Sequence, residues 1–278
     1  MEFACHAGAF NDLNLTGALG TIARMGFRYV DIGSGPHLDM DSMAKEPRGM
    51  AAKIKQDLQT FNLKLSDVCL NLSRISLADE QKRSDDIEMF KSILPFLVAI
   101  GTPGVTLSPG LTHPEEDTEA LDRTVTALRE MISAAKAATP ATNLQVSIEP
   151  QMDSMAQTPE IAQKLVEDVP GLSLTLDWAQ MVCQDIFHDQ LVELIPLARH
   201  IQIRQAARAQ LQVPFDRGRI NIEKVIKALK DADYDGVICV EYMQKKGWHG
   251  AIEVDGVTEC IQMRDAMRDA RNALNTQS

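Results

Sequence analysis

The sequence predicts an α/β fold, a (β/α)8 TIM barrel that forms a single domain over residues 1–278. The first observation is that short apolar runs with strand character alternate along the whole chain with longer runs of helical period. The second is that this alternation is strict, which implies parallel strands joined by right-handed crossovers. Eight such units in 278 residues fit a closed barrel, which takes roughly 250 residues, better than an open sheet or two smaller domains. The third is that no Gly/Ser linker, low-complexity tract or change in composition divides the chain.

Each unit begins with an expected strand, a short run of apolar and β-branched residues. The eight runs lie at residues 2–7, 28–32, 65–72, 104–107, 144–149, 172–177, 200–204 and 237–241. Helices are expected after them at residues 13–25, 50–61, 79–100, 117–138, 158–169, 189–198, 221–232 and 257–274. Gly26 ends the first helix, and Thr158 with Pro159 gives the helix at 158–169 an N-cap and a proline at its first position. A doubly wound sheet is the main alternative fold. The sequence motifs typical of it are missing, because no expected strand is followed by GxGxxG and no GxxxxGK[ST] occurs.

The composition excludes several function classes. A net charge of −11 argues against a protein that binds the phosphates of nucleic acid. Residues 1–12 lack the basic and apolar regions of a secretory signal, and no run approaches the roughly 20 apolar residues of a membrane span. The five cysteines are scattered without CxxC spacing, which is typical of buried thiols in a reducing cytoplasm and predicts no zinc site made of thiolates. We therefore expect a cytoplasmic protein that contacts neither nucleic acid nor a membrane.

Three expected strands share one feature, a single carboxylate at the C-terminal end. Glu149 follows the run LQVSI and precedes Pro150, which cannot donate to a strand ladder, while Asp177 ends GLSLTLD and Glu241 ends GVICVE. These strand ends meet on one face of a barrel, where enzymes of this architecture keep their chemistry. An unpaired buried carboxylate is unfavourable, so we expect a cation, a metal or a hydrogen-bond network to compensate the charge. Oxygen ligands suit Mg²⁺ or Mn²⁺, and with imidazole also Zn²⁺ or Co²⁺. The alternative is three unrelated acids, each paired with an arginine or lysine.

The seventh expected strand adds polar residues to the same interior. Alternation puts His200, Gln202 and Arg204 on one face of that strand, toward the inside of the barrel. Gln202 could offer a carbonyl oxygen to a metal. His200 could orient a substrate hydroxyl or could equally be a core histidine. Arg204 and Arg208 could bind anionic or hydroxyl-rich groups of a substrate. A solvated loop charge is the other interpretation of Arg208.

Four further residues are expected at the mouth of the barrel. His6 lies at the end of the first strand, while Gln151 and Gln180 follow the acids of the fifth and sixth strands. Each could hydrogen-bond a substrate hydroxyl, although His6 could be structural and the two amides could face solvent. Trp248, in the loop after the eighth strand, could form an apolar wall or belong to a lid. Trp178, next to Asp177, is expected in the core.

The order and spacing of five segments resemble one family over nearly the whole chain. These segments are MGFRYVDIG, VSIEP, TLDWAQ, RHIQIR and DYDGVICVEY. Together they resemble the xylose isomerase-like TIM-barrel superfamily, in its sugar phosphate isomerase/epimerase branch. The resemblance implies a metal held by Glu, Asp, His and Glu from strands five to eight. Those positions fall on Glu149, Asp177, Gln202 and Glu241, and the two glutamates would also move the substrate proton.

The resemblance also implies substrate-binding positions and exposes a departure. A substrate-binding histidine three residues after the aspartate falls on Gln180, and a substrate-binding arginine six residues after the metal histidine falls on Arg208. Histidines expected at three positions are glutamines here, Gln151, Gln180 and Gln202. The change implies weaker metal binding, an altered substrate or lost catalysis. An amide ligand would favour Mn²⁺ or Mg²⁺ over Zn²⁺ or Co²⁺.

The leading hypothesis is a divalent-metal-dependent isomerase or epimerase of a keto sugar or polyol derivative. Glu149 and Glu241 would remove and return the α-proton of an enediolate. A dehydratase, or a lyase of 3-keto-glycosides with C- or O-linkages, shares that first step and is the closest alternative. A non-catalytic sugar-binding or partner-subunit barrel is the alternative from another class. By family analogy we expect a homo-oligomer with a carbohydrate ligand, and a hetero-subunit partner is the other possibility.

Overall fold

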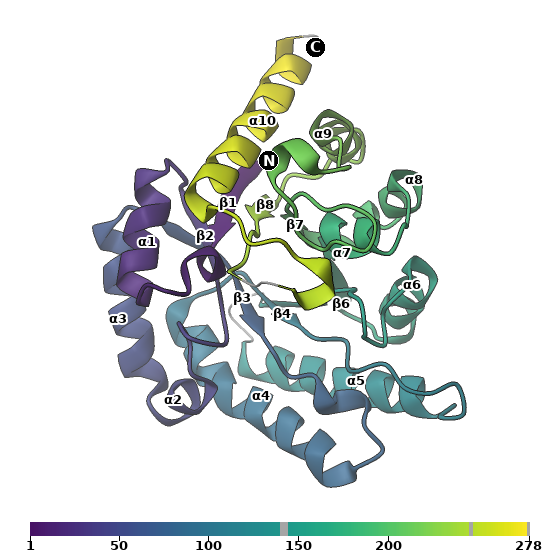
Figure 1. Ribbon diagram of the computed structural model, residues 1–278. Coiled ribbons are helices and arrows are strands. Elements are labelled where there is room, and N and C mark those ends of the chain that lie inside the picture. Colours follow the sequence, from purple (N-terminus) through teal and green to yellow (C-terminus); the bar gives the residue numbers. More distant parts are fainter. Residues whose placement is uncertain (140–143, 245–246, 277–278) are drawn as a thin grey trace.

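The computed structural model describes residues 1–139, 144–244 and 247–276, and within them eight parallel strands close into a barrel. Each strand pairs with its neighbours in chain order, and β1 (Glu2–His6) closes the barrel by pairing with both β2 (Tyr29–Gly33) and β8 (Val237–Val240). Helices surround the strands on the outside (Figure 1). The predicted (β/α)8 fold is therefore confirmed.

The remaining elements follow the predicted order closely. The other strands are β3 (Lys64–Leu70), β4 (Gly104–Leu107), β5 (Gln145–Ile148), β6 (Leu172–Asp177) and β7 (Ala198–Ile203). The longer helices are α1 (Leu15–Arg24), α3 (Pro47–Thr60), α4 (Glu80–Ile100), α5 (Ala120–Ala138), α6 (Pro159–Asp168), α9 (Ile222–Asp231) and α10 (Gly256–Thr276). Among the described residues, none of these helices is both long enough and apolar enough to cross a bilayer.

Three short helices depart from the prediction. The sequence did not indicate α2 (Met40–Lys45) or α7 (Trp178–Cys183), because six residues are too few to display a helical period. Asp39 and Asp177 cap their N-termini by accepting hydrogen bonds from backbone amides. The helix expected at 189–198 is only α8 (His188–Val192), since a 3-10 turn at Ile195–Leu197 precedes β7.

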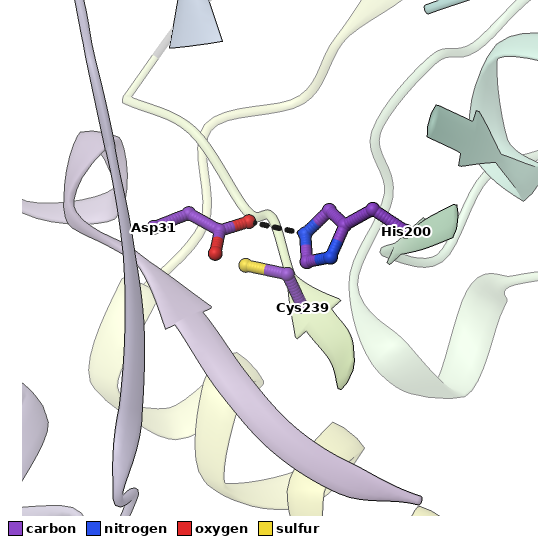
Figure 2. A group of neighbouring side chains, drawn as sticks. All are labelled: Asp31, His200 and Cys239. Atoms are coloured by element: carbon purple, nitrogen blue, oxygen red, sulfur yellow. Dashed lines mark hydrogen bonds and ion pairs between the residues drawn. The ribbon is translucent and has the colours of Figure 1, made fainter. Parts of the chain in front are cut away.

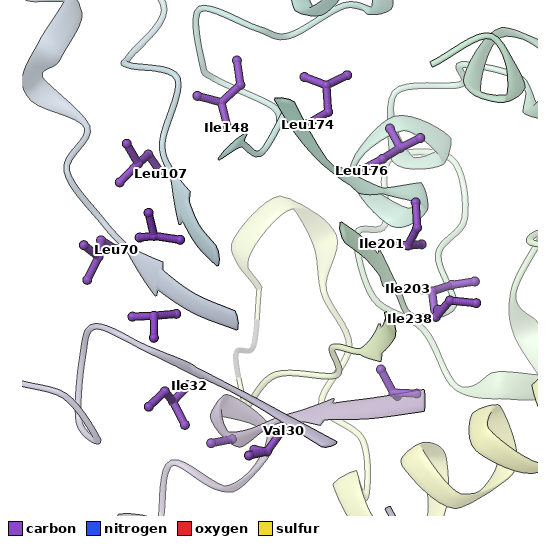
Figure 3. Packing of buried hydrophobic residues seen from close by; sticks show 14 of the residues in the cluster. Val30, Ile32, Leu70, Leu107, Ile148, Leu174, Leu176, Ile201, Ile203 and Ile238 are labelled. Atoms are coloured by element: carbon purple, nitrogen blue, oxygen red, sulfur yellow. The ribbon is translucent and has the colours of Figure 1, made fainter. Parts of the chain in front are cut away.

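The hydrophobic core lies between the strands and the surrounding helices. Figure 3 shows side chains that leave the strands on their outer face, among them Ile32, Leu107, Ile148 and Ile201, and all four are almost fully buried. Each such side chain contributes about 1.5–3 kcal/mol of hydrophobic stabilisation when buried. Alternation then turns the neighbouring residue on each strand into the barrel.

The barrel interior is polar, unlike the apolar layer around it. Asp67 of β3 accepts hydrogen bonds from Thr106 and from Arg199, whose Nη2 lies 2.7 Å from Asp67 Oδ1. Thr175 Oγ1 lies 2.6 Å from Thr106 Oγ1 and 2.7 Å from Ser147 Oγ. These buried groups satisfy one another across β3 to β7, as buried polar groups must. The network forms the lower part of the barrel and leaves the strand ends above it for the candidate site.

Candidate active site

A cavity of about 270 Å³ opens at the C-terminal ends of the strands. Six residues predicted for the site line it, namely His6, Glu149, Gln151, Gln180, Glu241 and Trp248. Arg204 lines it as well. The strand ends therefore bring residues from opposite ends of the chain to one place, as expected for a barrel of this architecture.

Two of the three predicted carboxylates, Glu149 and Glu241, line this cavity, and Asp177 is buried beside them. One oxygen each of Glu149, Asp177 and Glu241 lies within 4.8 Å of the others. The backbone N–H of Glu149 donates to Leu107 O at 3.1 Å, and that of Glu241 donates to Ile203 O at 3.0 Å, so the ladder fixes both residues just past their strands. Asp177 is fixed by its role as N-cap of α7, where Oδ1 accepts from the Ala179 amide at 2.8 Å. The predicted convergence of the three acids is thus present in the fold.

Arg204 supplies the positive charge within this cluster. Its Nη2 lies 2.9 Å from Asp177 Oδ2, and its Nη1 lies 2.5 Å from Glu241 Oε2 and donates to Glu241 O at 2.9 Å. The Arg204 side chain is fully buried. Sequence reasoning placed Arg204 on the interior face but considered only substrate binding. One guanidinium among three carboxylates leaves two negative charges uncompensated when all are ionised.

The charge imbalance changes the protonation of the acids. Burial, with the nearby charges of Glu241 and Asp177, raises the pKa of Glu149 well above its usual range. Burial also raises the pKa of Asp177 to about 6, against the opposing effect of Arg204. Gln180 Nε2 donates to Glu149 Oε1 at 3.3 Å and orients that carboxyl group. Without a further cation, Glu149 therefore tends to keep its proton, and an added cation would favour its ionised form.

The residues present fit a divalent metal ion with oxygen ligands. In the described part of the chain, Asp177 Oδ2 and Gln202 Oε1 are buried acceptors that no donor reaches with hydrogen-bond geometry. The two residues are partners in the β6–β7 ladder. Gln202 lies beneath the cavity, and its Nε2 is 3.7 Å from Cys69 Sγ. Together with the three carboxylates, the Gln202 amide oxygen would complete an oxygen donor set of the kind that suits Mg²⁺ or Mn²⁺.

Two predicted substrate-binding residues lie away from the cavity in this structure. His200 is buried one layer below it, where Nε2 lies 2.6 Å from Asp31 Oδ2 (Figure 2). The alternation of side chains along the strand correctly predicts that His200 points into the barrel. It does not predict how far below the cavity His200 lies, because that depends on strand register. Arg208 lies in the loop after β7, where its Nε is 3.7 Å from Asp185 Oδ2 and its side chain is 74% exposed. The position of Arg208 corresponds to the interpretation as a solvated loop charge.

The other mouth residues are held by local contacts. His6 Nδ1 accepts from the Gly8 amide at 2.9 Å, which turns the rest of the ring toward the cavity. Gln180 Oε1 accepts from the Met152 amide at 3.4 Å, so Gln180 links the loop after β5 to Glu149. Trp178 is buried in the core as predicted, with Nε1 3.4 Å from His188 Nδ1.

The sequence also matches a known protein family. A family model described as xylose isomerase-like TIM barrel matches residues 19–267. No curated protein sequence matches the chain.

Several solved structures are similar to the chain over nearly its full length. A D-psicose 3-epimerase from Clostridium cellulolyticum H10, solved with D-tagatose, shares 15% identity and a TM-score of 0.77, over 98% of this chain and 99% of that one. A probable 3-DHS dehydratase from Bacillus anthracis shares 15% identity and a TM-score of 0.73, over 96% and 99%. A xylose isomerase-like TIM barrel protein from Mycobacterium smegmatis, in complex with magnesium, shares 15% identity and a TM-score of 0.71, over 97% of each chain. At these identities the likeness concerns the fold alone. Because the family model covers most of the sequence, the chain belongs to the xylose isomerase-like TIM-barrel family.

Proposed function

We propose that this barrel is a divalent-metal-dependent isomerase or epimerase of a keto sugar or a related polyol derivative. The observation that carries the proposal is the meeting of Glu149, Asp177 and Glu241 within 4.8 Å at the cavity. The similarity to a D-psicose 3-epimerase supports the same reaction class. A cavity of about 270 Å³ is at the small end of ligand pockets, which favours a substrate of monosaccharide size.

The metal in this proposal is Mn²⁺ or Mg²⁺, with Co²⁺ or Zn²⁺ as alternatives. Glu149, Asp177, Gln202 and Glu241 would hold it, while Arg204 stays paired with Asp177 and Glu241. When bound, such an ion supplies Lewis-acid polarisation of a carbonyl oxygen. Together, the ion and Arg204 would carry three positive charges. They would balance the cluster when all three carboxylates are ionised and leave one excess positive charge when Glu149 holds a proton.

The two glutamates differ in their surroundings, and the difference suggests their roles. Glu241 pairs with the Arg204 guanidinium, whereas the Glu149 carboxyl accepts a hydrogen bond from the neutral amide of Gln180, and its pKa is raised in the metal-free protein. In the proposed reaction, Glu241 removes the α-proton as general base, and Glu149 returns a proton to the enediolate as general acid. The reverse reaction exchanges these roles. His6, Gln151 and Trp248, which line the cavity, would orient the substrate hydroxyls and cover the ring.

A metal analysis combined with proton exchange tests this function. Purified protein incubated with Mn²⁺ should contain one equivalent of ion, and Glu149→Gln should contain less. In D₂O, a ketose that is a substrate should acquire deuterium at the α-carbon with the wild type and not with Glu149→Gln or Glu241→Gln. A wild-type protein that binds no metal after this incubation would overturn the metalloenzyme proposal and favour a non-catalytic sugar-binding barrel.

A dehydratase or 3-keto-glycoside lyase is the second candidate, and the similarity to a probable dehydratase favours it. Removal of the α-proton by Glu241 would be followed by loss of a β-leaving group, with Glu149 as the acid that protonates it. Product NMR separates the two reactions, because elimination creates an unsaturated product and epimerisation creates a stereoisomer.

A further inference from the structure

A second group of ligand-type side chains lies in the barrel interior below the cavity. Asp31 of β2, His200 of β7 and Cys239 of β8 point toward one another in Figure 2. One oxygen, one ring nitrogen and the sulfur lie within 4.8 Å of each other. All three residues are almost fully buried. Cys239 precedes Glu241 by two residues, so this group, here called the inner cluster, forms the layer directly beneath the carboxylates.

The fold explains why these three residues meet. β1 lies between β8 and β2, and its residue level with Cys239 is Ala4. Ala4 has the same orientation as the cavity-lining His6, because the two are separated by one residue on the strand. On the β2 side, Asp31 is level with His6 rather than with Ala4, and the small side chain of Ala4 leaves room for Asp31 and Cys239 to approach each other across β1. His200 reaches Asp31 from the other side, with Nε2 2.6 Å from Oδ2.

The donor atoms differ from those of the carboxylate cluster above. The upper cluster offers only oxygen, whereas the inner cluster offers one oxygen, one imidazole nitrogen and one sulfur. Mixed N, O and S sets bind borderline cations such as Zn²⁺ and Co²⁺, and three protein ligands leave a fourth position open. Ser66 Oγ donates to Asp31 Oδ1 at 2.5 Å, which fixes the carboxylate and leaves Oδ2 for a metal.

We propose that Asp31, His200 and Cys239 form a second metal site, selective for Zn²⁺ or Co²⁺ over Mg²⁺ or Mn²⁺. The ion takes the place of the proton that His200 Nε2 and Asp31 Oδ2 share, so that each atom becomes a ligand, and the Cys239 thiol loses its proton to bind as the thiolate. Both protons pass to solvent. Zinc bonds of about 2.0–2.3 Å place tetrahedral ligands roughly 3–4 Å apart, so small side-chain rotations bring the inner cluster to this geometry. The spacing of residues 31, 200 and 239 forms no sequence motif, which is why cysteine spacing alone predicts no zinc site.

The ion has a short route to this site. Gly33 and Glu241 follow Asp31 and Cys239 by two residues on the same strands, and both line the cavity. An ion in the cavity is therefore one side-chain layer from the inner cluster. The proposal is independent of the reaction assigned to the upper cluster, because the two sites share no ligand.

Cobalt absorption tests the second site directly in the full-length protein. After treatment with a chelator, the protein is titrated with Co²⁺, and a thiolate-to-cobalt charge-transfer band is recorded in the near ultraviolet. The band should appear in the wild type, disappear on addition of Zn²⁺, and be absent from Cys239→Ser. It should persist in Glu149→Gln, which alters only the upper cluster. It should also persist in the matched control Cys5→Ser, because Cys5 lies next to Cys260 on the outer side of β1.

Three outcomes would overturn the proposal. They are the absence of the band in wild-type protein, its survival in Cys239→Ser, and its loss in Glu149→Gln. Near-UV circular dichroism establishes that Cys239→Ser is folded. If that variant does not fold, Asp31→Asn replaces it, and elemental analysis should show the loss of one equivalent of zinc relative to wild type. Manganese content measured on the same samples reports the upper site separately, so failure of one site is distinguished from failure of the other.

Discussion

Two buried arginines at opposite ends of β7 show how differently the two ends of the barrel are built. Arg199, at the lower end, pairs with Asp67 at 2.7 Å and donates to Thr106 Oγ1 at 3.1 Å. Arg204, at the upper end, pairs with Asp177 and Glu241, and Glu149 completes the same cluster. The lower guanidinium thus pairs with one carboxylate. The upper guanidinium pairs with two carboxylates, and a third carboxylate lies in the same cluster.

The two ends differ in their balance of charge, and this difference bears on the proposed function. The Asp67–Arg199 pair joins one cation to one anion, so its charge is balanced. The upper cluster is left with excess negative charge, and the pKa values of Glu149 and Asp177 are raised as a result of burial and of this charge. Groups with perturbed pKa values in a cavity are candidates for proton transfer or cation binding. The comparison therefore favours the upper end as the place of the proposed chemistry, and the predictions below test this difference between the two ends.

The largest expected effect is the loss of turnover in Glu149→Gln. Glutamine keeps the shape and the contact with Gln180 but cannot transfer a proton. Because general acid–base groups contribute roughly 10²–10⁴-fold to rate, kcat should fall by about that factor. Measurement of kcat on the substrate found in the exchange assay, for Glu149→Gln and Glu241→Gln in parallel, gives the result.

The stability of the same variant is its control. The pKa of Glu149 is raised in the folded protein, so the metal-free wild type should lose stability as the pH rises from the ordinary carboxyl pKa into the raised range. Glu149→Gln should lack this loss, which thermal unfolding in the presence of a chelator would reveal. A variant that is less stable than wild type at neutral pH would contradict the excess of negative charge in this cluster.

The next largest expected effect is a loss of stability on replacing either of the two arginines. Arg199→Met and Arg204→Met each leave a buried carboxylate without its partner, so each should lose about 3–5 kcal/mol of unfolding free energy in metal-free buffer. Saturating Mn²⁺ should restore part of the loss only in Arg204→Met, because a divalent ion would supply positive charge to the upper cluster alone. Denaturant unfolding with and without Mn²⁺ measures both. Equal recovery in the two variants would mean that the lower end also binds the ion.

The position of the site at the strand ends could be predicted from the sequence. The depth of each residue in the barrel and the pairing of the charged groups could not. Strand ends follow from the local pattern, so the convergence of Glu149, Asp177 and Glu241 could be predicted. Alternation gave the inward face of β7 but not which layer each residue occupies. His200 therefore lies below the cavity, and Arg204 lies among the carboxylates.

Other differences have similar physical causes. The pairing of Arg204 with acids on β6 and β8 depends on the register of two ladders, which no local pattern encodes. Arg208 was inferred from an offset along a loop, and the course of a loop is not fixed by periodicity. Most predicted strand ends lie within two residues of the observed ones, because apolar runs are bounded by residues that interrupt a ladder.

A moderate effect is expected from Gly104→Ala at the start of β4. A Cβ at Gly104 would lie 2.2 Å from Arg199 Nη1, and moving the guanidinium would disturb its pair with Asp67. We expect a loss of about 1–3 kcal/mol, as for other overpacked sites. Gly49→Ala in α3 is the matched control, because a Cβ there meets nothing within 4 Å and should raise stability by about 0.5–1 kcal/mol. If Gly104→Ala is as stable as wild type, Arg199 is not held as tightly as this comparison requires.

The smallest effect is expected from Arg208→Ala, which tests one of the two predicted substrate-binding positions that lie outside the cavity. The side chain is mostly exposed and its nearest carboxylate partner is Asp185, so stability should change by less than about 0.5 kcal/mol. The KM of the ketose substrate should stay at the wild-type value, whereas Gln180→Ala should lower kcat because Gln180 orients Glu149. Steady-state kinetics on both variants measure this KM and this kcat. A large increase in KM for Arg208→Ala would show that the loop after β7 folds over the substrate, since only such a movement would bring this guanidinium to the cavity.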